Sequence, residues 1–174
     1  MTEAEVERLF REYHPQLVRF LTRQLGDRDR AEELAQETFL RALRQERLTN
    51  ERAWLFTVAN NLVRDDVRRD VRQRHHLTLL QAEERQRERE AHATQPEADH
   101  EESTKLARQA LGMLAERDRQ ALLMREEGLD YGEIAQALEL SAGSIGTTLA
   151  RARRRLVEAY EALQRSAGAS NAAS

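Results

Sequence analysis

The sequence of 174 residues contains no cysteine, which excludes disulfides, thiolate nucleophiles and cysteine-based metal sites. Proline and glycine are scarce, with 2 and 7 residues, and aromatic residues make up only 5% of the chain. No apolar run approaches the roughly 20 residues that span a bilayer. The first ten residues lack the basic-then-apolar pattern of a signal peptide. We therefore expect a cytoplasmic protein that makes no membrane contact of its own.

The residues that are abundant favour helices. Charged residues make up 34% of the chain and are mainly arginine and glutamate, accompanied by many alanines, leucines and glutamines. All of these are good helix formers, whereas the turn formers glycine and proline are rare. The composition therefore predicts an all-α protein built from amphipathic helices.

The charges are segregated along the chain. Residues 83–102 hold eight acidic residues and three arginines, a net charge of −5. Because the whole chain has a net charge of −3, the remainder carries about +2. The near-neutral total therefore does not exclude a nucleic-acid partner for the basic stretches.

Three helices are predicted in the N-terminal half, residues 1–75. The first runs from about Glu3 to Leu25 with apolar residues, including Phe10, on one face. Pro15 should kink or break it near His14, and Gly26 is suited to end it.

The second and third helices of this half have recognisable starts. Asp29 lies three residues before Glu32, as in a capping box, and this helix ends near Leu43, which we place on its buried face. Asn50 is suited to cap a third helix from about Glu51 to Arg74, and its apolar side includes Val67. These helices form the first of two small domains, a bundle of three or four helices.

The helical periodicity is lost over residues 76–103, which are polar, acidic and contain Pro96. We interpret this segment as a flexible linker. A second helical domain is predicted over residues 104–165. The low-complexity tail, residues 166–174, is predicted to be disordered.

Residues 128–156, GLDYGEIAQALELSAGSIGTTLARARRRL, indicate a helix, a tight turn and a second helix. Asp130 and Glu133 form a capping box before the first helix, and Ser141 is suited to cap the second. Residues 141–156 contain four arginines and no acidic residue. Small polar residues at the start of the second helix could reach base edges while the arginines hold phosphates. The pattern predicts a DNA-binding helix-turn-helix, although a helical hairpin with a solvated basic face has the same apolar spacing.

Residues 29–43, DRAEELAQETFLRAL, resemble the helix of bacterial sigma factors that docks on the clamp of core RNA polymerase. Residues 53–65, AWLFTVANNLVRD, resemble the following helix, which melts and reads the minus-ten element. Residues 114–156 resemble the domain that reads the minus-thirty-five element. The three segments follow in the family's order, with no additional middle domain between them. The chain therefore resembles the compact extracytoplasmic-function (ECF) class of the sigma-seventy family.

This resemblance implies three groups of contact residues. Those implied for core polymerase are Asp29, Glu32, Glu33, Leu34, Gln36, Glu37 and Phe39. Those implied for minus-ten DNA are Arg47, Leu48, Thr49, Asn50, Asn60, Asn61, Arg64, Asp65, Arg68 and Arg72. Those implied for minus-thirty-five DNA are Ser141, Ser144, Thr147, Thr148, Arg151, Arg154 and Arg155.

Two departures from the family pattern concern the helix-turn-helix. The turn commonly contains glycine where this chain has Glu139, so we expect a tighter or differently placed turn. The recognition helix often carries a basic residue, serine and arginine where this chain has Gly146, Thr147 and Thr148. The recognition helix therefore carries fewer base-reading arginines than the family pattern.

The predicted function is that of a non-enzymatic subunit that directs core RNA polymerase to promoters, with an anti-sigma protein as a further partner implied by the resemblance. A stand-alone helix-turn-helix regulator that binds operators as a dimer is the alternative, although no dimerisation stripe is apparent. The five histidines show no metal-ligand spacing, so neither an enzyme nor a cofactor is expected.

Overall fold

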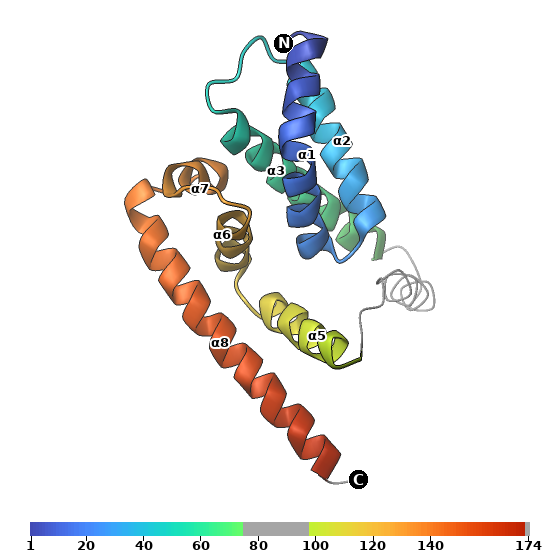
Figure 1. The fold of residues 1–174 in the computed structure, drawn as a ribbon, viewed down its shortest axis with the longest axis vertical. Helices are drawn as coiled ribbons and strands as arrows, with labels where there is room; N and C mark the ends of the chain where they lie inside the picture. The colour runs from blue at the N-terminus through green and yellow to red at the C-terminus, as the bar shows by residue number, and fades with distance from the viewer. Residues whose placement is uncertain (75–97, 173–174) are drawn as a thin grey trace. The chain divides into compact units, whose positions relative to one another are not determined.

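The computed structural model describes residues 1–74 and 98–172, and its regular structure consists of helices, with no strand in these two stretches. The all-α prediction is confirmed. The chain divides into two units, Met1–Ala93 and Thr94–Ser174 (Figure 1). None of the described helices is both long enough and apolar enough to cross a membrane.

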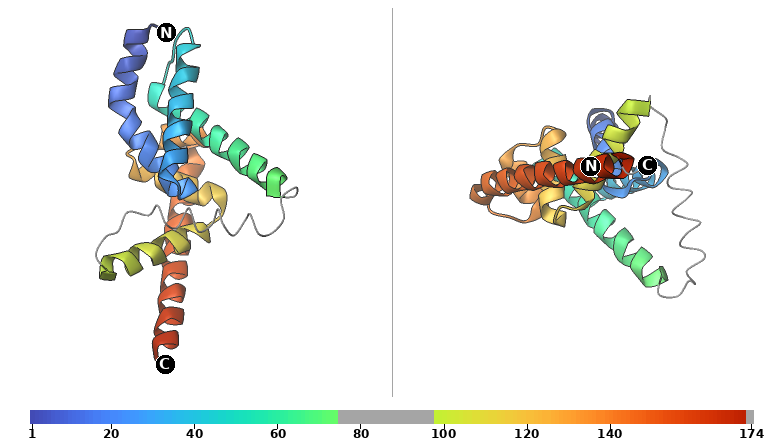
Figure 2. Two further views of the ribbon diagram at one scale, coloured as in Figure 1. Left: turned by 90° about the vertical axis from the view of Figure 1, so that its right-hand side faces the viewer. Right: turned by 90° about the horizontal axis from the view of Figure 1, so that it is seen from below.

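The first unit contains α1 (Glu3–Leu25), α2 (Arg28–Leu43) and α3 (Glu51–Arg74). The three helices pack against one another pairwise. Phe20 and Phe56 are fully buried between α1 and α3, with ring centroids 5.0 Å apart in a tilted pair. Figure 2 shows α1 and α2 as an antiparallel pair, with the C-terminal end of α3 extending beyond them.

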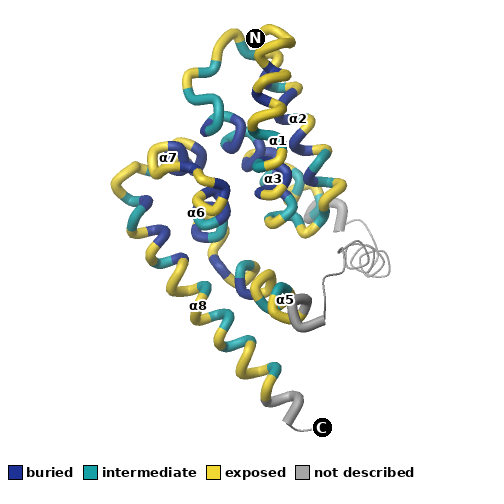
Figure 3. Tube along the Cα trace, in the orientation of Figure 1, coloured by how far each residue is buried: buried dark blue, intermediate teal, exposed yellow. Residues whose placement is uncertain are grey.

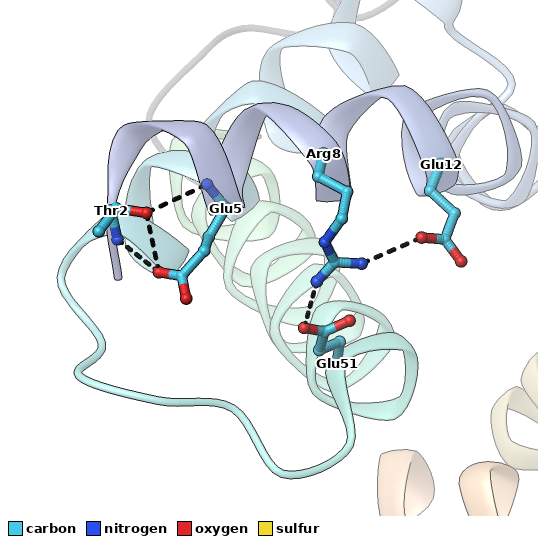
Figure 4. Close-up of polar contacts among 5 residues, drawn as sticks. All are labelled: Thr2, Glu5, Arg8, Glu12 and Glu51. Atoms are coloured by element: carbon cyan, nitrogen blue, oxygen red, sulfur yellow. Dashed lines mark hydrogen bonds and ion pairs between the residues drawn. The ribbon is translucent and has the colours of Figure 1, made fainter.

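The start of α1 is held by polar contacts that the sequence analysis did not identify (Figure 4). The Thr2 side chain accepts a hydrogen bond from the Glu5 backbone amide, and the Glu5 carboxylate accepts one from the Thr2 amide. Arg8 then contacts Glu12 at 3.2 Å and Glu51, at the start of α3, at 2.5 Å. These contacts fix the two helix starts together.

Pro15 lies inside α1, which continues from Glu3 to Leu25, so the break expected near His14 is absent. A proline removes one amide donor and so leaves the carbonyl four residues earlier, on Arg11, without its helical partner. Pro15 and Arg11 are both exposed, so water can solvate that carbonyl. Leu9 before the proline and Leu17 after it are fully buried. Packing on both sides therefore keeps the helix continuous.

The caps of the first unit were predicted in part. Gly26 ends α1 in the left-handed region at φ 69°, and the Asn50 side chain accepts a hydrogen bond from the Ala53 amide at 3.2 Å. Both predictions are confirmed. The capping-box prediction for Asp29 is wrong, because Asp27 caps α2 by accepting from the Arg30 amide at 3.0 Å. Asp29 instead lies in the first turn of α2, where its charge still complements the helix dipole.

The second unit contains α5 (Ala98–Gly112), α6 (Glu116–Glu126), α7 (Tyr131–Leu138) and α8 (Ala142–Ala172). Helices α5, α6 and α7 each pack on α8, and α6 also packs on α7. Figure 3 shows that the buried positions of α8 lie in its N-terminal part. They include Ile145 and Leu149, which are fully buried, as is Ile134 of α7.

The helical boundaries of this unit differ from the sequence prediction. Helix α5 begins at Ala98, within the segment interpreted as a linker; the rest of that segment, up to residue 97, lies outside the described residues. Helix α8 continues to Ala172, through most of the tail predicted to be disordered. An established helix extends readily into an alanine-rich segment, because propagation costs far less than nucleation.

Candidate nucleic-acid and protein interfaces

The residues of α2 predicted to bind polymerase divide into surface and core. Asp29, Glu33 and Gln36 are exposed, and Glu32 and Glu37 are half-buried. Leu34 and Phe39 are buried, with 6% and 4% of their surface exposed. The two apolar residues therefore hold the bundle together, and only the polar residues of this set can meet a partner directly.

Contacts with basic residues orient three acidic side chains of α2. Glu32 lies 3.0 Å from His14 of α1, and Glu37 lies 2.9 Å from Arg41 one turn later. Glu33 contacts Arg30, which also reaches Asp66 of α3. The pKa of Arg30 is raised, chiefly by its hydrogen bond to Asp66. Arg30 thus ties α2 to α3, a contact the sequence analysis missed.

Exposed apolar side chains lie beside these acidic residues. Leu40 is 53% exposed and Leu43 40%, and helical spacing places both on the face of α2 that carries Glu33 and Gln36. Phe10 of α1 is 39% exposed and its ring lies 5.0 Å from that of Phe39. The prediction that Leu43 lies on the buried face of its helix is therefore wrong, and Phe10, on the apolar face of α1, is partly exposed. Leu40 was missed, although its spacing from Gln36 was a signal. We call Glu33, Gln36, Leu40, Leu43 and Phe10 the α2 face.

The loop before α3 and the polar face of that helix contain the residues predicted to meet minus-ten DNA. In the loop, Arg47 and Thr49 are exposed and Leu48 and Asn50 half-buried, and Asn50 serves as the cap of α3. On α3, Asn61, Asp65 and Arg68 are exposed and Arg64 is half-buried. The side chain of Arg72 lies outside the described residues.

Asn60 is not part of this surface, because it is fully buried. Its Oδ1 accepts a hydrogen bond from Gln24 of α1 at 3.4 Å. Adjacent helix positions differ by about 100° in direction, so only one of Asn60 and Asn61 can face solvent here. Val67 is 51% exposed, contrary to its predicted place on the apolar side. The predicted polar face of α3 is therefore exposed at Asn61, Asp65 and Arg68 but not at Asn60.

The predicted helix-turn-helix is present in the second unit as α7, a three-residue turn and α8. The Asp130–Glu133 capping box is confirmed, with both of its hydrogen bonds at 2.8 Å. The turn keeps the position predicted from the family pattern, because Glu139 itself adopts the left-handed conformation at φ 54° and ψ 45°. The expectation of a differently placed turn is therefore wrong.

The start of α8 carries small polar residues, as predicted. Ser141 and Thr147 are exposed and Ser144 is half-buried, with its hydroxyl donating to the Ser141 carbonyl at 2.8 Å. Thr148 is buried, at 6% exposure, and so belongs to the packing side of the helix. A Cβ at Gly146 would lie 3.7 Å from Cε2 of Tyr131, which is an ordinary contact distance.

The arginines of α8 have unequal surroundings. Arg151 donates to Asp118 of α6 through Nε at 3.1 Å and through Nη2 at 2.5 Å, and Arg155 reaches the same carboxylate at 3.2 Å. The Asp118 side chain is 1% exposed. The hydrogen bond from Arg151 is the main cause that lowers the pKa of Asp118. Arg153 and Arg154 are exposed.

Two family models match the chain in the order of the two units. The model described as Sigma-70 region 2 matches residues 9–73, and the one described as Sigma-70, region 4 matches residues 104–156. The sigma factor RpoE of Bartonella quintana, solved in complex with the anti-sigma factor NepR, has a similar fold. Its TM-score is 0.65 at 23% identity, over 90% of this chain and 97% of that one.

Curated relatives with similar sequences are RNA polymerase sigma factors. The RNA polymerase sigma factor YlaC of Bacillus subtilis (strain 168) is 30% identical over 87% of this chain and 89% of its own length. The ECF RNA polymerase sigma factor EcfG of Rhodopseudomonas palustris (strain TIE-1) is 32% identical over 82% of this chain and 77% of its own length. The chain belongs to the sigma-70 family of RNA polymerase sigma factors, in the ECF class.

Proposed function

We propose that this chain directs core RNA polymerase to specific promoters and assists the start of transcription, without catalysing a reaction itself. The observation that carries the proposal is the presence of regions 2 and 4 of the family in two separate units of one chain. Two weak promoter contacts on one chain reinforce each other when both sites are engaged. A stand-alone dimeric regulator is not favoured, because it would leave the polymerase-binding region without a role.

The first unit is proposed to bind polymerase through the α2 face. Its Glu33 carboxylate and Gln36 amide suit a basic partner surface, and Leu40, Leu43 and Phe10 add apolar area that a protein partner would bury. Asp29, Glu32 and Glu37 border this face. Leu34 and Phe39 contribute by holding α2 in place.

The same unit is proposed to contact minus-ten DNA through α3 and the loop before it. Asn61, Arg64 and Arg68 can meet exposed bases and phosphates. Arg47, Leu48 and Thr49 form the loop proposed to receive a flipped base. Asn60 acts from the core, by packing α3 on α1.

The second unit is proposed to read the minus-thirty-five element with the exposed residues at the start of α8, Ser141, Ser144 and Thr147. The arginines later in α8 supply positive charge beside the DNA backbone. Side chains this short suit readout of groove shape or water-mediated contacts better than bidentate base recognition.

An anti-sigma protein is proposed as a regulator that occludes the α2 face, since the fold is shared with a sigma factor solved in such a complex. The proposal places the chain in the cytoplasm with the polymerase, in a stress or envelope response.

Run-off transcription with purified core polymerase tests the proposed function. Addition of the chain should yield promoter-dependent products from genomic fragments that core polymerase alone does not transcribe. No such product from any fragment would contradict it.

A binding experiment tests the α2 face separately. The double variant Glu33→Arg, Leu40→Ser should bind core polymerase at least about tenfold more weakly, since it reverses a charge and removes apolar contact area. Both residues are exposed, so folding should be retained. Glu161→Arg, on an exposed position of α8, is the matched control. Equal binding of the double variant and this control would remove the α2 face from the interface.

A further inference from the structure

The basic run of α8 contains four arginines that sequence patterning treats alike, but the structure separates them. Arg151 gives two of its donors to the Asp118 carboxylate in a bidentate contact, and Arg155 adds a third donor from the next turn. Arg154 has no carboxylate partner among the described residues, and it is exposed.

Helix geometry alone does not separate the two arginines, because Arg151 follows Ser144 by seven residues and so also lies near the proposed DNA-facing residues. Arg154 follows Thr147 by seven residues, close to two full turns, so the two side chains share one face. That face lies opposite the buried positions Ile145, Leu149 and Ala152. Arg151 lies on the flank of α8 that meets α6, with a side chain 40% exposed.

The burial of Asp118 strengthens its ion pair with Arg151. A carboxylate that is 1% exposed has lost its hydration and is tolerated only when charge-assisted hydrogen bonds replace it. If Arg151 turned toward a DNA phosphate, Asp118 would keep only the single 3.2 Å contact with Arg155. A phosphate at the exposed surface offers Arg151 a solvent-screened attraction in exchange, so the internal pair is favoured.

We propose that Asp118 is a positioning residue that retains Arg151 as a structural cation, so that Arg154 makes the phosphate contact on the DNA-facing side of α8. This rests on the proposed DNA binding by the second unit. It divides the predicted minus-thirty-five residues into those that touch DNA and those that hold the recognition helix on α6.

The number of phosphate contacts can be measured from the salt dependence of binding. The slope of log K against log salt is negative, and each lost phosphate contact reduces its magnitude by about 0.9. This reduces the affinity change between 50 and 200 mM salt by about 3.5-fold. Slopes below are given as magnitudes. The experiment uses the full chain and a fluorescein-labelled 30-base-pair duplex of mixed sequence, with binding followed by anisotropy. Contacts made by the first unit are the same in all variants and cancel in the comparison.

The expected result is that Arg154→Gln lowers the slope by about 0.9, whereas Arg151→Gln leaves it unchanged. Asp118→Asn should raise the slope by about 0.9, because it releases Arg151 toward the phosphates. Asp118→Glu, which keeps the charge, should restore the original slope. Circular dichroism establishes that each variant retains its helices, and the two arginine variants test the proposal even if Asp118→Asn does not fold.

The proposal is overturned if Arg151→Gln lowers the slope as much as Arg154→Gln. It is also overturned if a folded Asp118→Asn variant shows an unchanged or lower slope, because Asp118 would then not withhold Arg151 from DNA. If the unaltered chain does not bind the duplex, or no arginine variant changes the slope, the proposed DNA binding by α8 fails as well.

Discussion

Glu139 in the turn of the helix-turn-helix offers a sharp test of how backbone conformation limits the stability of this protein. Within the described stretches it is the single non-glycine residue with positive φ. Its amide donates to the carbonyls of Ala135 and Gln136, and the Leu140 amide donates to the Ala135 carbonyl at 2.9 Å. These hydrogen bonds close the end of α7 as a Schellman motif, which requires the left-handed conformation.

Replacement of Glu139 by glycine should stabilise the second unit by about 0.7 kcal/mol. The left-handed conformation costs an L-residue about 1–2 kcal/mol, and glycine avoids this cost. The greater freedom of glycine in the unfolded chain offsets about 0.4–1 kcal/mol of the gain. For a unit of this size, the difference corresponds to an increase in melting temperature of about 3–6 °C.

Amide hydrogen exchange over α7 and α8 measures this effect locally, and Trp54 fluorescence monitors the first unit as an internal reference. Exchange through opening of the unit should slow about threefold, the equivalent of 0.7 kcal/mol. Glu139→Gln is the matched control for loss of charge and should leave exchange unchanged. Gln136→Gly, at an exposed interior position of α7, should instead destabilise the unit by up to about 1 kcal/mol.

The reasoning would be refuted if Glu139→Gly left exchange unchanged or accelerated it. An equal gain from Glu139→Gln would also refute it, because the stabilisation would then come from charge rather than from the backbone.

Three further predictions concern the folded units. Gly146→Ala should stabilise α8 by up to about 1 kcal/mol in thermal unfolding, because the added methyl group meets Tyr131 only at an ordinary contact distance; a loss of stability would show that the position is crowded. Because the pKa of Asp118 is lowered, its carboxylate stabilises the fold fully above the ordinary pKa of 3.8, and this stabilisation is lost as pH falls through the lowered pKa. Urea unfolding between pH 5 and 2.5 should show this loss of stability. The Asp118→Asn variant should lack this pH dependence. Phe20→Ala should destabilise the first unit by about 3–5 kcal/mol, detected by Trp54 fluorescence in urea, since Phe20 is fully buried against Phe56; a cost below about 1 kcal/mol would contradict this packing.

The agreement between sequence and structure is greatest where the signals are local. Gly26, Asn50 and the Asp130–Glu133 pair act through hydrogen bonds within a few residues of themselves, so their roles follow from residue type and spacing. The predicted helix break at Pro15 is absent for a tertiary reason, because burial of Leu9 and Leu17 on either side outweighs the lost hydrogen bond.

The binding surfaces were less predictable, because periodicity gives the direction of an apolar stripe but not its width. Leu43 and Val67 fit the stripes of their helices, yet no neighbouring helix covers them sufficiently, and both are exposed. Asn60 and Asn61 are both polar, and the packing of α3 on α1 determines which of them is buried.

By itself, the sequence determined that this chain is helical, that it contains two regions of the sigma-70 family in order, and that four arginines and no acidic residue lie within residues 141–156. Composition, helical period and local capping suffice for those conclusions. The tertiary structure alone decided which arginines of α8 remain available to DNA. That outcome depends on Asp118, 33 residues before Arg151, which α6 brings against α8 as a buried carboxylate. A long-range ion pair of this kind leaves no periodic trace in the sequence.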